Sequence, residues 1–438
     1  MLLTIKQILD SLSYKIHIDI KPNFLNKTFY MSAVVTRFLI YLLIIFSLFP
    51  YIQILPLGTD SQPNALFISL LLFPFCCKWK MNKYLVFLLL IAIFSLFVLF
   101  LSPITFRGIR SVTNYFTLFF VTYVTYFALR KIKGIPYSLF KYCVYGWFFV
   151  GTIQLFLFPN FLSFLIPRGN SGAMIELGRG IVCLAPEPTF YALICLFFAL
   201  IAFLNFGNRQ DIKKIYYIIA IQLFLYSRSS LVIFILAGIL GIYILIRIFS
   251  SKTYIFKAVI IIATIPIIAI PIINSGILDN YRIGKLLNIL IQKPELFIVM
   301  DGSVNERFVH VFFPIYGFLT NWGLPHGYGE FPVFLEGCMK DSSFQNLFSD
   351  YVLNRKVDPY IMSGWGSILF ELGAIGLLLL YTIYKLVSNI LTGNKMVITL
   401  LLFYAILANA IPFSNAIIPF FIGNLFYLSY KKRQEYIN

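Results

Sequence analysis

Charged residues are scarce in this sequence. They make up 12% of its 438 residues, whereas 60% are hydrophobic, and the mean hydropathy is +0.87. A soluble globular protein carries about 25% charged residues. So little polar surface cannot cover a water-facing fold, which excludes an ordinary soluble enzyme. The composition predicts an all-α, polytopic integral membrane protein.

Residues and motifs that hold metals or nucleotides are also few or missing. The chain has only three histidines and six cysteines, with no Cys-x-x-Cys pair and no Cys/His ligand spacing, so a zinc site is not expected. It lacks a Walker A sequence, a zinc-protease helix motif, a serine-hydrolase elbow and a dinucleotide fingerprint. It also lacks the Asp-x-Asp of metal-dependent nucleotide-sugar enzymes. We therefore expect no metal and no other cofactor.

Apolar runs recur along the whole chain. A membrane-spanning helix needs about 20 apolar residues, which predicts about twelve such helices. The predicted spans are 36–56, 64–77, 84–102, 111–129, 140–158, 188–206, 213–226, 229–247, 254–273, 363–384, 396–411 and 413–430. The chain thus divides into spans 1–9 within 36–273 and spans 10–12 within 363–438, which ends in a short tail. The first 35 residues lack the apolar core of a cleavable signal peptide, so 1–35 is predicted to be an amphipathic segment.

Positive charge is in excess, with 35 Lys and Arg against 17 Asp and Glu and a formal net charge of +18. Most of these cations lie in short loops between apolar runs, where they set the orientation in the membrane, so nucleic acid is not an expected partner. The pattern predicts that both termini are cytoplasmic. It also predicts two long outer loops, 159–187 and 274–362, the second with amphipathic helices. Arginine predominates among the outer cations, and its planar fork suits phosphate.

The first candidate site lies in the first outer loop, around the sequence G-R-G-I-V-C-L-A-P-E-P-T-F-Y-A. Arg168 and Arg179 flank a glycine-rich turn, and Glu187 stands between two prolines just before a predicted helix. Proline is well tolerated in a first helical turn, so the backbone holds this carboxylate at the mouth of the helix. Two interpretations stay open: an acid that complements the helix dipole, or a functional acid or base. The nearby arginines favour the second.

Arg228, in Y-S-R-S-S, is the second candidate. The apolar run before it, 215–226, spans about 18 Å at the rise of an α-helix, well short of a hydrocarbon core about 30 Å thick. Arg228 is therefore predicted at a re-entrant turn below the outer surface, where an ionisable group is a functional hypothesis. The alternative is a side chain that snorkels to water from a short hairpin.

The second outer loop contains D-G-S-V-N-E-R-F-V-H. Its Ser303 and Glu306 form a capping box, which predicts that a helix starts there. Arg307 and His310 then share one helical face, a combination that suits gripping a phosphate beside a proton carrier. The alternative is a surface pair on a helix that lies along the bilayer. Arg282, earlier in the loop, is a second-line candidate.

The same loop continues with N-W-G-L-P-H-G-Y-G-E-F-P at 321–332. Trp322 and Tyr328, together with Trp365 further along, suit either stacking on sugar rings or an interfacial aromatic belt. His326 is a weaker candidate than His310 for contact with a substrate.

These motifs together resemble a known family. They are G-R-G-x(3)-L-A-P-E-P-T-F-Y-A before a helix, S-R-S-S at a short hairpin, S-x(3)-R-x(2)-H and P-H-G-Y-G in a long outer loop, and G-W-G-S-I-L-F-E-L-G-A-I-G before another helix. The arrangement is similar to that of the O-antigen polymerases, which share a superfamily with the O-antigen ligases. The motifs cover roughly 160–385, and the topology covers the whole chain.

The resemblance implies an α-helical fold similar to the lipid-phosphate-dependent, GT-C-like glycosyltransferases, in the bacterial inner membrane. The implied activity is polymerisation of undecaprenyl-diphosphate-linked O-antigen repeat units for lipopolysaccharide, at the periplasmic face. The growing glycan moves to a sugar hydroxyl of the next lipid-linked unit, and lipid diphosphate leaves. Neither metal nor nucleotide is implied. Membrane lipids are expected partners, and a chain-length regulator in the same membrane is a candidate partner.

The resemblance and the residues together give each candidate a role. Glu187 or His310 is the expected base for the acceptor hydroxyl, and arginines are expected to bind the diphosphate. The expected substrate-binding residues are Arg179, Arg228 and Arg307, followed by Arg168, Arg282 and His326. Two rival functions stay open: an O-antigen ligase that uses a lipid A-core acceptor, and a flippase or transporter of lipid-linked sugars without any chemistry.

Overall fold

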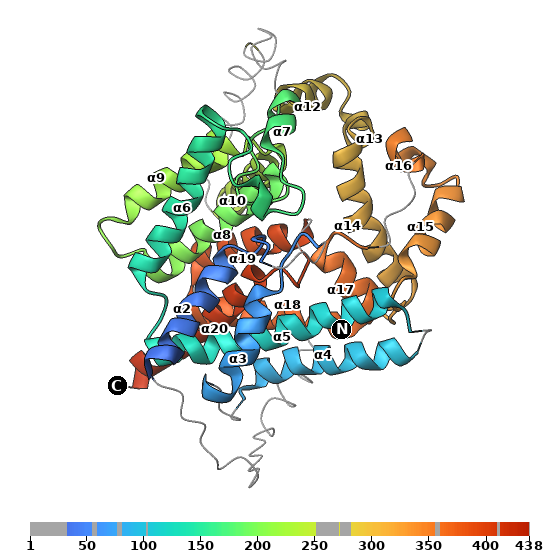
Figure 1. Cartoon of the computed structure of the whole chain (residues 1–438). Helices are drawn as coiled ribbons and strands as arrows, with labels where there is room; N and C mark the ends of the chain where they lie inside the picture. Colours follow the sequence, from blue (N-terminus) through green and yellow to red (C-terminus); the bar gives the residue numbers. More distant parts are fainter. Residues whose placement is uncertain are drawn as a thin grey trace.

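The structure of the protein is a computed structural model that describes residues 33–54, 59–76, 81–101, 104–250, 271, 282–354, 360–409 and 412–437. The regular secondary structure of these residues is helical, and no strand occurs among them (Figure 1). The all-α prediction is therefore confirmed for this part of the chain. The predicted amphipathic segment 1–35 and the predicted span 254–273 lie almost entirely outside it.

Several helices are long and apolar enough to cross a membrane, and within the described residues there are five. They are α4 (Lys83–Phe100), α5 (Phe106–Ile132), α6 (Tyr137–Phe156), α8 (Pro188–Phe206) and the segment Gly364–Ile390, which comprises α17 (Gly364–Leu372), η5 (Gly373–Gly376) and α18 (Leu377–Ile390). Shorter apolar helices are α2 (Ala33–Leu48), α3 (Asn64–Cys76), α10 (Ser230–Ser250) and α19 (Gly393–Ala408). The protein is thus a membrane-embedded helical protein, whereas the number of twelve spans stays a prediction.

Helix α5 is the most buried of these spans, and α20 (Ile417–Ile437) packs along it. Gly423 of α20 allows the close approach, because a Cβ there would lie 2.7 Å from the Cβ of Thr125. The hydroxyl of Thr122 also donates a hydrogen bond to the carbonyl of Pro419, at 3.0 Å. Small residues and interhelical hydrogen bonds of this kind hold helices together in a membrane, where lipid is as apolar as the side chains.

The short apolar run before Arg228 does not form one uniform α-helix. It consists of α9 (Ile212–Ile221) and a single π-helical turn (Gln222–Tyr226), and the chain then turns at Arg228, whose φ is 44°. Isolated π-helical turns are rare in proteins, and those that occur are often found at functional sites. The turn leads directly into α10.

The segment 274–362, predicted to be the second outer loop, is largely helical in its described residues. Its helices are α12 (Arg282–Gln292), α13 (Phe297–Met300), α14 (Gly302–Thr320), α15 (Phe331–Lys340) and α16 (Asp350–Leu353), which appear in yellow to orange in Figure 1. Val309 and Phe313 of α14 join Phe370 of α17 in a separate apolar cluster. Gly366 of α17 lies so close to α14 that a Cβ there would approach the carbonyl oxygen of His310 to 2.8 Å. This packing fixes α14 against the transmembrane segment.

The start of α14 corrects one detail of the sequence analysis. The predicted cap was Ser303, but the N-cap is Asp301, whose Oδ1 accepts the backbone N–H of Val304 at 2.9 Å. Both residues are good caps, and the sequence gives no means of choosing between them. The choice leaves the hydroxyl of Ser303 available to a side chain from the other outer loop.

Candidate functional site

The two segments predicted to be outer loops, 159–187 and 274–362, meet at a polar cavity of about 520 Å³. Its charged lining residues are Asp60, Arg110, Arg168, Arg179, Glu187, Glu306, Arg307 and Glu371. Four residues predicted from the sequence are among them: Arg168, Arg179, Glu187 and Arg307. The fold therefore brings both loops to one site, although more than 100 residues separate Glu187 from Arg307 in the sequence.

The G-R-G sequence has a steric reason for its second glycine. A Cβ on Gly180 would lie 2.1 Å from the carbonyl oxygen of Ser227. The backbones touch there because the N–H of Ile181 donates to the carbonyl of Tyr226, at 2.9 Å. Any larger residue would push the backbone at position 180 away from the backbone of Tyr226 and Ser227. The contact thus anchors the segment that carries Arg179 on the turn after the π-helical residues.

A buried glutamine of α6 holds the rest of this loop. The side-chain oxygen of Gln154 accepts the hydroxyl of Ser171 at 2.6 Å and the N–H of Cys183 at 2.8 Å. Its amide nitrogen donates to the carbonyls of Phe161 and Cys183, at 2.8 and 3.0 Å. One side chain thus connects the start, middle and end of the loop. The sequence analysis missed Gln154, and a polar residue inside an apolar span was the signal available for it.

Glu187 occupies the N-cap position of α8, but its side chain makes no capping hydrogen bond. Pro188 follows it as the first helical residue, and the backbone at Glu187 is extended, with φ −145° and ψ 155°. The carboxylate lines the cavity instead, where it interacts electrostatically with Arg179 and Arg307. Of the two interpretations, this position favours the functional acid.

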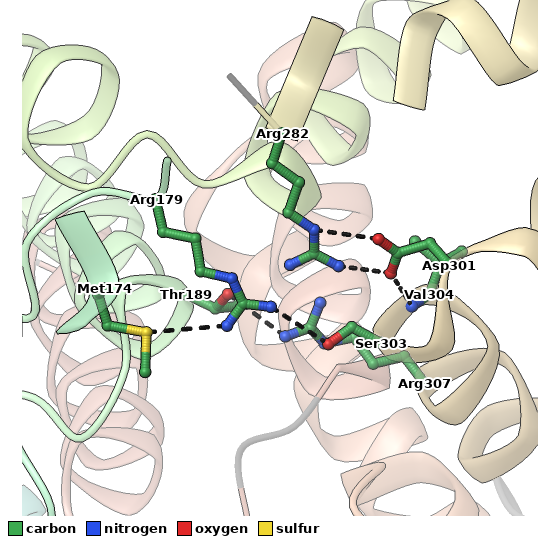
Figure 2. A network of polar contacts seen from close by, with 8 residues as sticks. All are labelled: Met174, Arg179, Thr189, Arg282, Asp301, Ser303, Val304 and Arg307. Atoms are coloured by element: carbon green, nitrogen blue, oxygen red, sulfur yellow. Dashed lines mark hydrogen bonds and ion pairs between the residues drawn. The ribbon is translucent and has the colours of Figure 1, made fainter. Parts of the chain in front are cut away.

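The side chains of Arg179 and Arg307 come from different segments, and their guanidinium groups lie near each other (Figure 2). Arg179 donates to the hydroxyl of Ser303 at 3.5 Å and to the sulfur of Met174 at 3.8 Å. Arg307 donates to the hydroxyl of Thr189 at 3.3 Å. These partners are neutral and the contacts are long, and neither arginine forms an ion pair within the part of the chain that the structure describes.

The environment of these two cations opposes their charge. Burial lowers the pKa of Arg179, and the nearby Arg282 lowers it further. Burial also lowers the pKa of Arg307; Glu187 counteracts this, while Arg282 and Arg179 add to it. A guanidinium stays protonated in proteins nevertheless. Two cations held close together without a strong acidic partner form a site for an anion.

Arg282 and Arg168 are paired with aspartates. Arg282 binds Asp301 through two hydrogen bonds, at 2.5 and 3.2 Å (Figure 2). Burial alone would raise the pKa of Asp301, but the hydrogen bond and charge of Arg282 lower it below its ordinary value of 3.8. Arg168 binds Asp60 in the same bidentate way, with its Nε 2.7 Å from Oδ1. Arg282 does not line the cavity, whereas Arg168 lies at it with a side chain that is 59% exposed.

The remaining predicted residues lie elsewhere. His310 is buried against Phe331, and its Nδ1 accepts the N–H of Met362 at 3.3 Å. The ring of His326 stacks on Phe370 at 4.2 Å, and its Nε2 lies 3.0 Å from the carbonyl oxygen of Gly317. Neither histidine is among the residues that line the cavity. Arg307 therefore lines the cavity and His310 does not, although the two residues are only three positions apart on one helix.

Arg228 also lies away from the cavity lining. Its Nε donates to the carbonyl of Leu225, at 3.1 Å, within its own turn. The turn contributes to the site indirectly, through the backbone contact with Gly180. A turn is present at Arg228, but the structure does not bring this arginine to Arg179 and Arg307.

A second, more apolar cavity of about 570 Å³ adjoins the first. Leu66, Phe106 and Ile109 line it, while Arg110 and Asn114 line both cavities. The guanidinium of Arg110 lies 4.4 Å from the ring centre of Tyr360. The site therefore has a polar chamber beside an apolar one, with a cation where they join.

No cluster of three or more His, Cys, Asp or Glu side chains in the described part of the chain is arranged to hold a metal ion. Comparison with protein-family models and with curated proteins finds no match to this sequence.

Proposed function

We propose that the protein is a glycosyltransferase that polymerises undecaprenyl-diphosphate-linked O-antigen repeat units at the periplasmic face of the bacterial inner membrane. The observation that carries the proposal is the pair Arg179 and Arg307, which line a polar cavity beside Glu187 without an ion-pair partner among the described residues. A diphosphate gives these two arginines the bidentate anionic partner that they lack among the described residues. The cavity also supplies a carboxylate next to the bound anion.

The adjoining cavities suit an amphipathic substrate. A lipid-linked glycan has an apolar chain, a charged diphosphate and a polar sugar in that order. The apolar chamber adjoins the polar chamber that contains Arg179 and Arg307, and Arg110 and Asp60 line both chambers. This succession supports a lipid-linked donor over a soluble sugar.

In the proposed reaction, a hydroxyl oxygen of the acceptor sugar attacks the anomeric carbon of the donor glycan. The bond between that carbon and the diphosphate oxygen breaks, and the lipid diphosphate leaves as an anion. Arg179 and Arg307 stabilise the charge that develops on it. The acceptor hydroxyl loses its proton to a base, which must lie within hydrogen-bond reach.

Glu187 is better placed than His310 to be that base. Its carboxylate lines the cavity, whereas the Nδ1 of His310 already accepts a backbone N–H and its ring is buried against Phe331. We therefore assign the proton transfer to Glu187. His310 then serves to connect α14 to the segment before α17.

The base assignment predicts different results for Glu187→Gln and His310→Ala. Turnover of Glu187→Gln should fall by about 10²–10⁴-fold, the usual contribution of a general base, while lipid diphosphate still binds. His310→Ala should lose thermal stability, because the N–H of Met362 loses its partner, and should keep its turnover per folded molecule. Normal turnover in Glu187→Gln would exclude it as the base; the exposed Glu176→Gln is the matched control.

The proposed function is tested directly with purified protein in lipid nanodiscs. Undecaprenyl-diphosphate-linked repeat units are added, and gel electrophoresis should show a ladder of longer lipid-linked glycans. A product formed only when lipid A-core is supplied would identify a ligase instead. Movement of the substrate across a vesicle membrane without any lengthened glycan would contradict the proposal and identify a transporter.

A further inference from the structure

Another part of the cavity wall carries an acid without an arginine partner. Glu371 belongs to α17, the first part of the apolar segment Gly364–Ile390, and it lines the polar cavity. Its Oε2 accepts the hydroxyl of Tyr115 at 2.7 Å, and its Oε1 accepts the hydroxyl of Ser111 at 3.2 Å. It forms no ion pair within the described residues. Hydroxyl groups, and not cations, are thus its hydrogen-bond donors.

An ionisable side chain in a membrane-spanning segment is costly and is a functional hypothesis by default. Two hydroxyls do not use all of the hydrogen-bonding capacity of Glu371, because a carboxylate has about four acceptor positions. The side chain is only half-buried, and it lines the cavity. The remaining acceptor positions are therefore accessible to a molecule in the cavity.

The residues around Glu371 have the same neutral, hydroxyl-binding character. Asn114 is on α5, one residue from Tyr115, and Ser367 is one helical turn before Glu371 on α17; both line the cavity. The amide of Asn114 makes no hydrogen bond to another described residue and carries both a donor and an acceptor. We call Ser111, Asn114, Tyr115, Ser367 and Glu371 the hydroxyl wall.

We infer that the hydroxyl wall binds the acceptor sugar, an inference that rests on the proposed function. Sugar hydroxyls both donate and accept hydrogen bonds, so a carboxylate, an amide and three hydroxyl-bearing side chains match them. A diphosphate, in contrast, requires donors and positive charge, which Arg179 and Arg307 supply. The cavity then has separate subsites: the arginines hold the diphosphate of the donor, and the hydroxyl wall holds hydroxyls of the acceptor.

The test measures two ligands separately on the full-length protein in nanodiscs. One is the lipid-free repeat-unit oligosaccharide, released from the lipid-linked units by mild acid. The other is undecaprenyl diphosphate without sugar. Binding of both is measured by microscale thermophoresis for the wild type and for Glu371→Gln, Asn114→Ala and Arg307→Ala, with Glu176→Gln as the control.

Glu371→Gln and Asn114→Ala should each weaken oligosaccharide binding by about tenfold, the usual scale for losing a hydrogen bond in a buried polar site, and leave undecaprenyl diphosphate binding unchanged. Arg307→Ala should show the opposite pattern. Asn114→Ala decides the matter if Glu371→Gln does not fold, since Asn114 makes no hydrogen bond to another described side chain or backbone group.

Unchanged oligosaccharide binding in the Asn114 and Glu371 variants would overturn the inference and leave Glu371 as a connection between α5 and α17. Equal weakening of both ligands would also overturn it, because a general loss of cavity shape would explain that result. If the wild type binds no undecaprenyl diphosphate, the proposed function fails instead. The two failures are therefore distinguishable.

Discussion

Each of the two segments predicted to be outer loops, 159–187 and 274–362, contributes one arginine with neutral hydrogen-bond partners and one arginine paired with an acid. Within the described residues, the side chains of Arg179 and Arg307, the inner arginines, form hydrogen bonds only to hydroxyl and thioether groups, at 3.3–3.8 Å. Arg168 and Arg282, the outer arginines, each bind an aspartate through two hydrogen bonds. All four lie in the two segments between predicted membrane spans. What differs between them is the position of Asp60 and Asp301.

The difference separates two uses of one residue type. A bidentate arginine–carboxylate pair is strong and geometrically specific, so Arg282 and Asp301 hold the start of α14 in place. An arginine without such a partner retains its charge for a ligand, at the cost of being buried close to other cations. The inner arginines therefore carry the proposed donor site, Arg282 holds the start of α14 next to it, and the exposed Arg168 contributes little.

Among the variants that test this comparison, Arg307→Ala should have the largest effect. Polymerisation should slow by about 10²–10³-fold, the scale for removing one donor that stabilises developing negative charge. Arg307→Lys should recover only part of the rate, because lysine lacks the planar fork. Arg107→Ala is the matched control, since Arg107 is exposed and outside the cavity lining. A normal rate in Arg307→Ala would remove the distinction between inner and outer arginines.

Gly180→Ala should come next, because it displaces an inner arginine without removing it. The added Cβ would overlap the carbonyl of Ser227, and overpacking of this kind costs about 1–3 kcal/mol. Thermal unfolding should shift downward, and the rate should fall in the folded fraction. Gly238→Ala on α10 provides the control, since a Cβ there meets nothing within 4 Å. Equal behaviour of the two variants would contradict the steric explanation.

Asp301→Asn should leave Arg282 without a charged partner, as Arg179 and Arg307 are. Asparagine also caps helices well, so α14 should keep its start, while Arg282 loses its charged partner. We expect undecaprenyl diphosphate to bind more tightly, and more so at low ionic strength, because screening weakens the added attraction. Asp350→Asn removes the same charge from an exposed position on α16 and serves as control. Weaker binding in Asp301→Asn would mean that the ion pair itself shapes the site.

Arg168→Ala should have the smallest effect. Its side chain is 59% exposed, and exposed ion pairs contribute about 0–1 kcal/mol. The polymerisation rate and the melting temperature should both stay close to the wild-type values. A loss of rate as large as that of Arg307→Ala would place Arg168 in the diphosphate site and break the comparison.

The ion pair between Arg282 and Asp301 predicts the direction in which pH changes the stability of the protein. Because Arg282 keeps the pKa of Asp301 below 3.8, the pair contributes fully to stability above that value. The contribution should be lost only as the pH falls through the lower, folded-state pKa. Assays between pH 5 and 8 therefore compare the variants with this pair intact in the wild type.

Much of the local structure was predictable from the sequence. Low charge and repeated apolar runs predicted helices in a membrane, and the π-helical turn and the break at Arg228 fall where the run was too short. The start of α14 was predicted, but its cap was assigned to Ser303, since serine and aspartate compete on similar terms. Boundaries of this kind depend on which side chain a distant residue engages, here Arg282 with Asp301.

The candidate site was less predictable. Of the residues selected from the sequence, Arg168, Arg179, Glu187 and Arg307 line the cavity. His310 and His326 were selected too, but their rings pack against phenylalanines. Glu371 was passed over, although an acid inside an apolar run was visible. No sequence feature indicates which of several buried polar groups will face a cavity.

By itself, the sequence determined the helices, their apolar character and the presence of arginines and a proline-flanked glutamate in two loops, because these follow from composition and local periodicity. Only the tertiary structure decided which arginines face the cavity without an acid and which are neutralised. That outcome depends on contacts between residues far apart in the chain, such as Arg168 with Asp60 and Glu371 with Tyr115. The three-dimensional arrangement of a few acids therefore separates the proposed donor site from its scaffold.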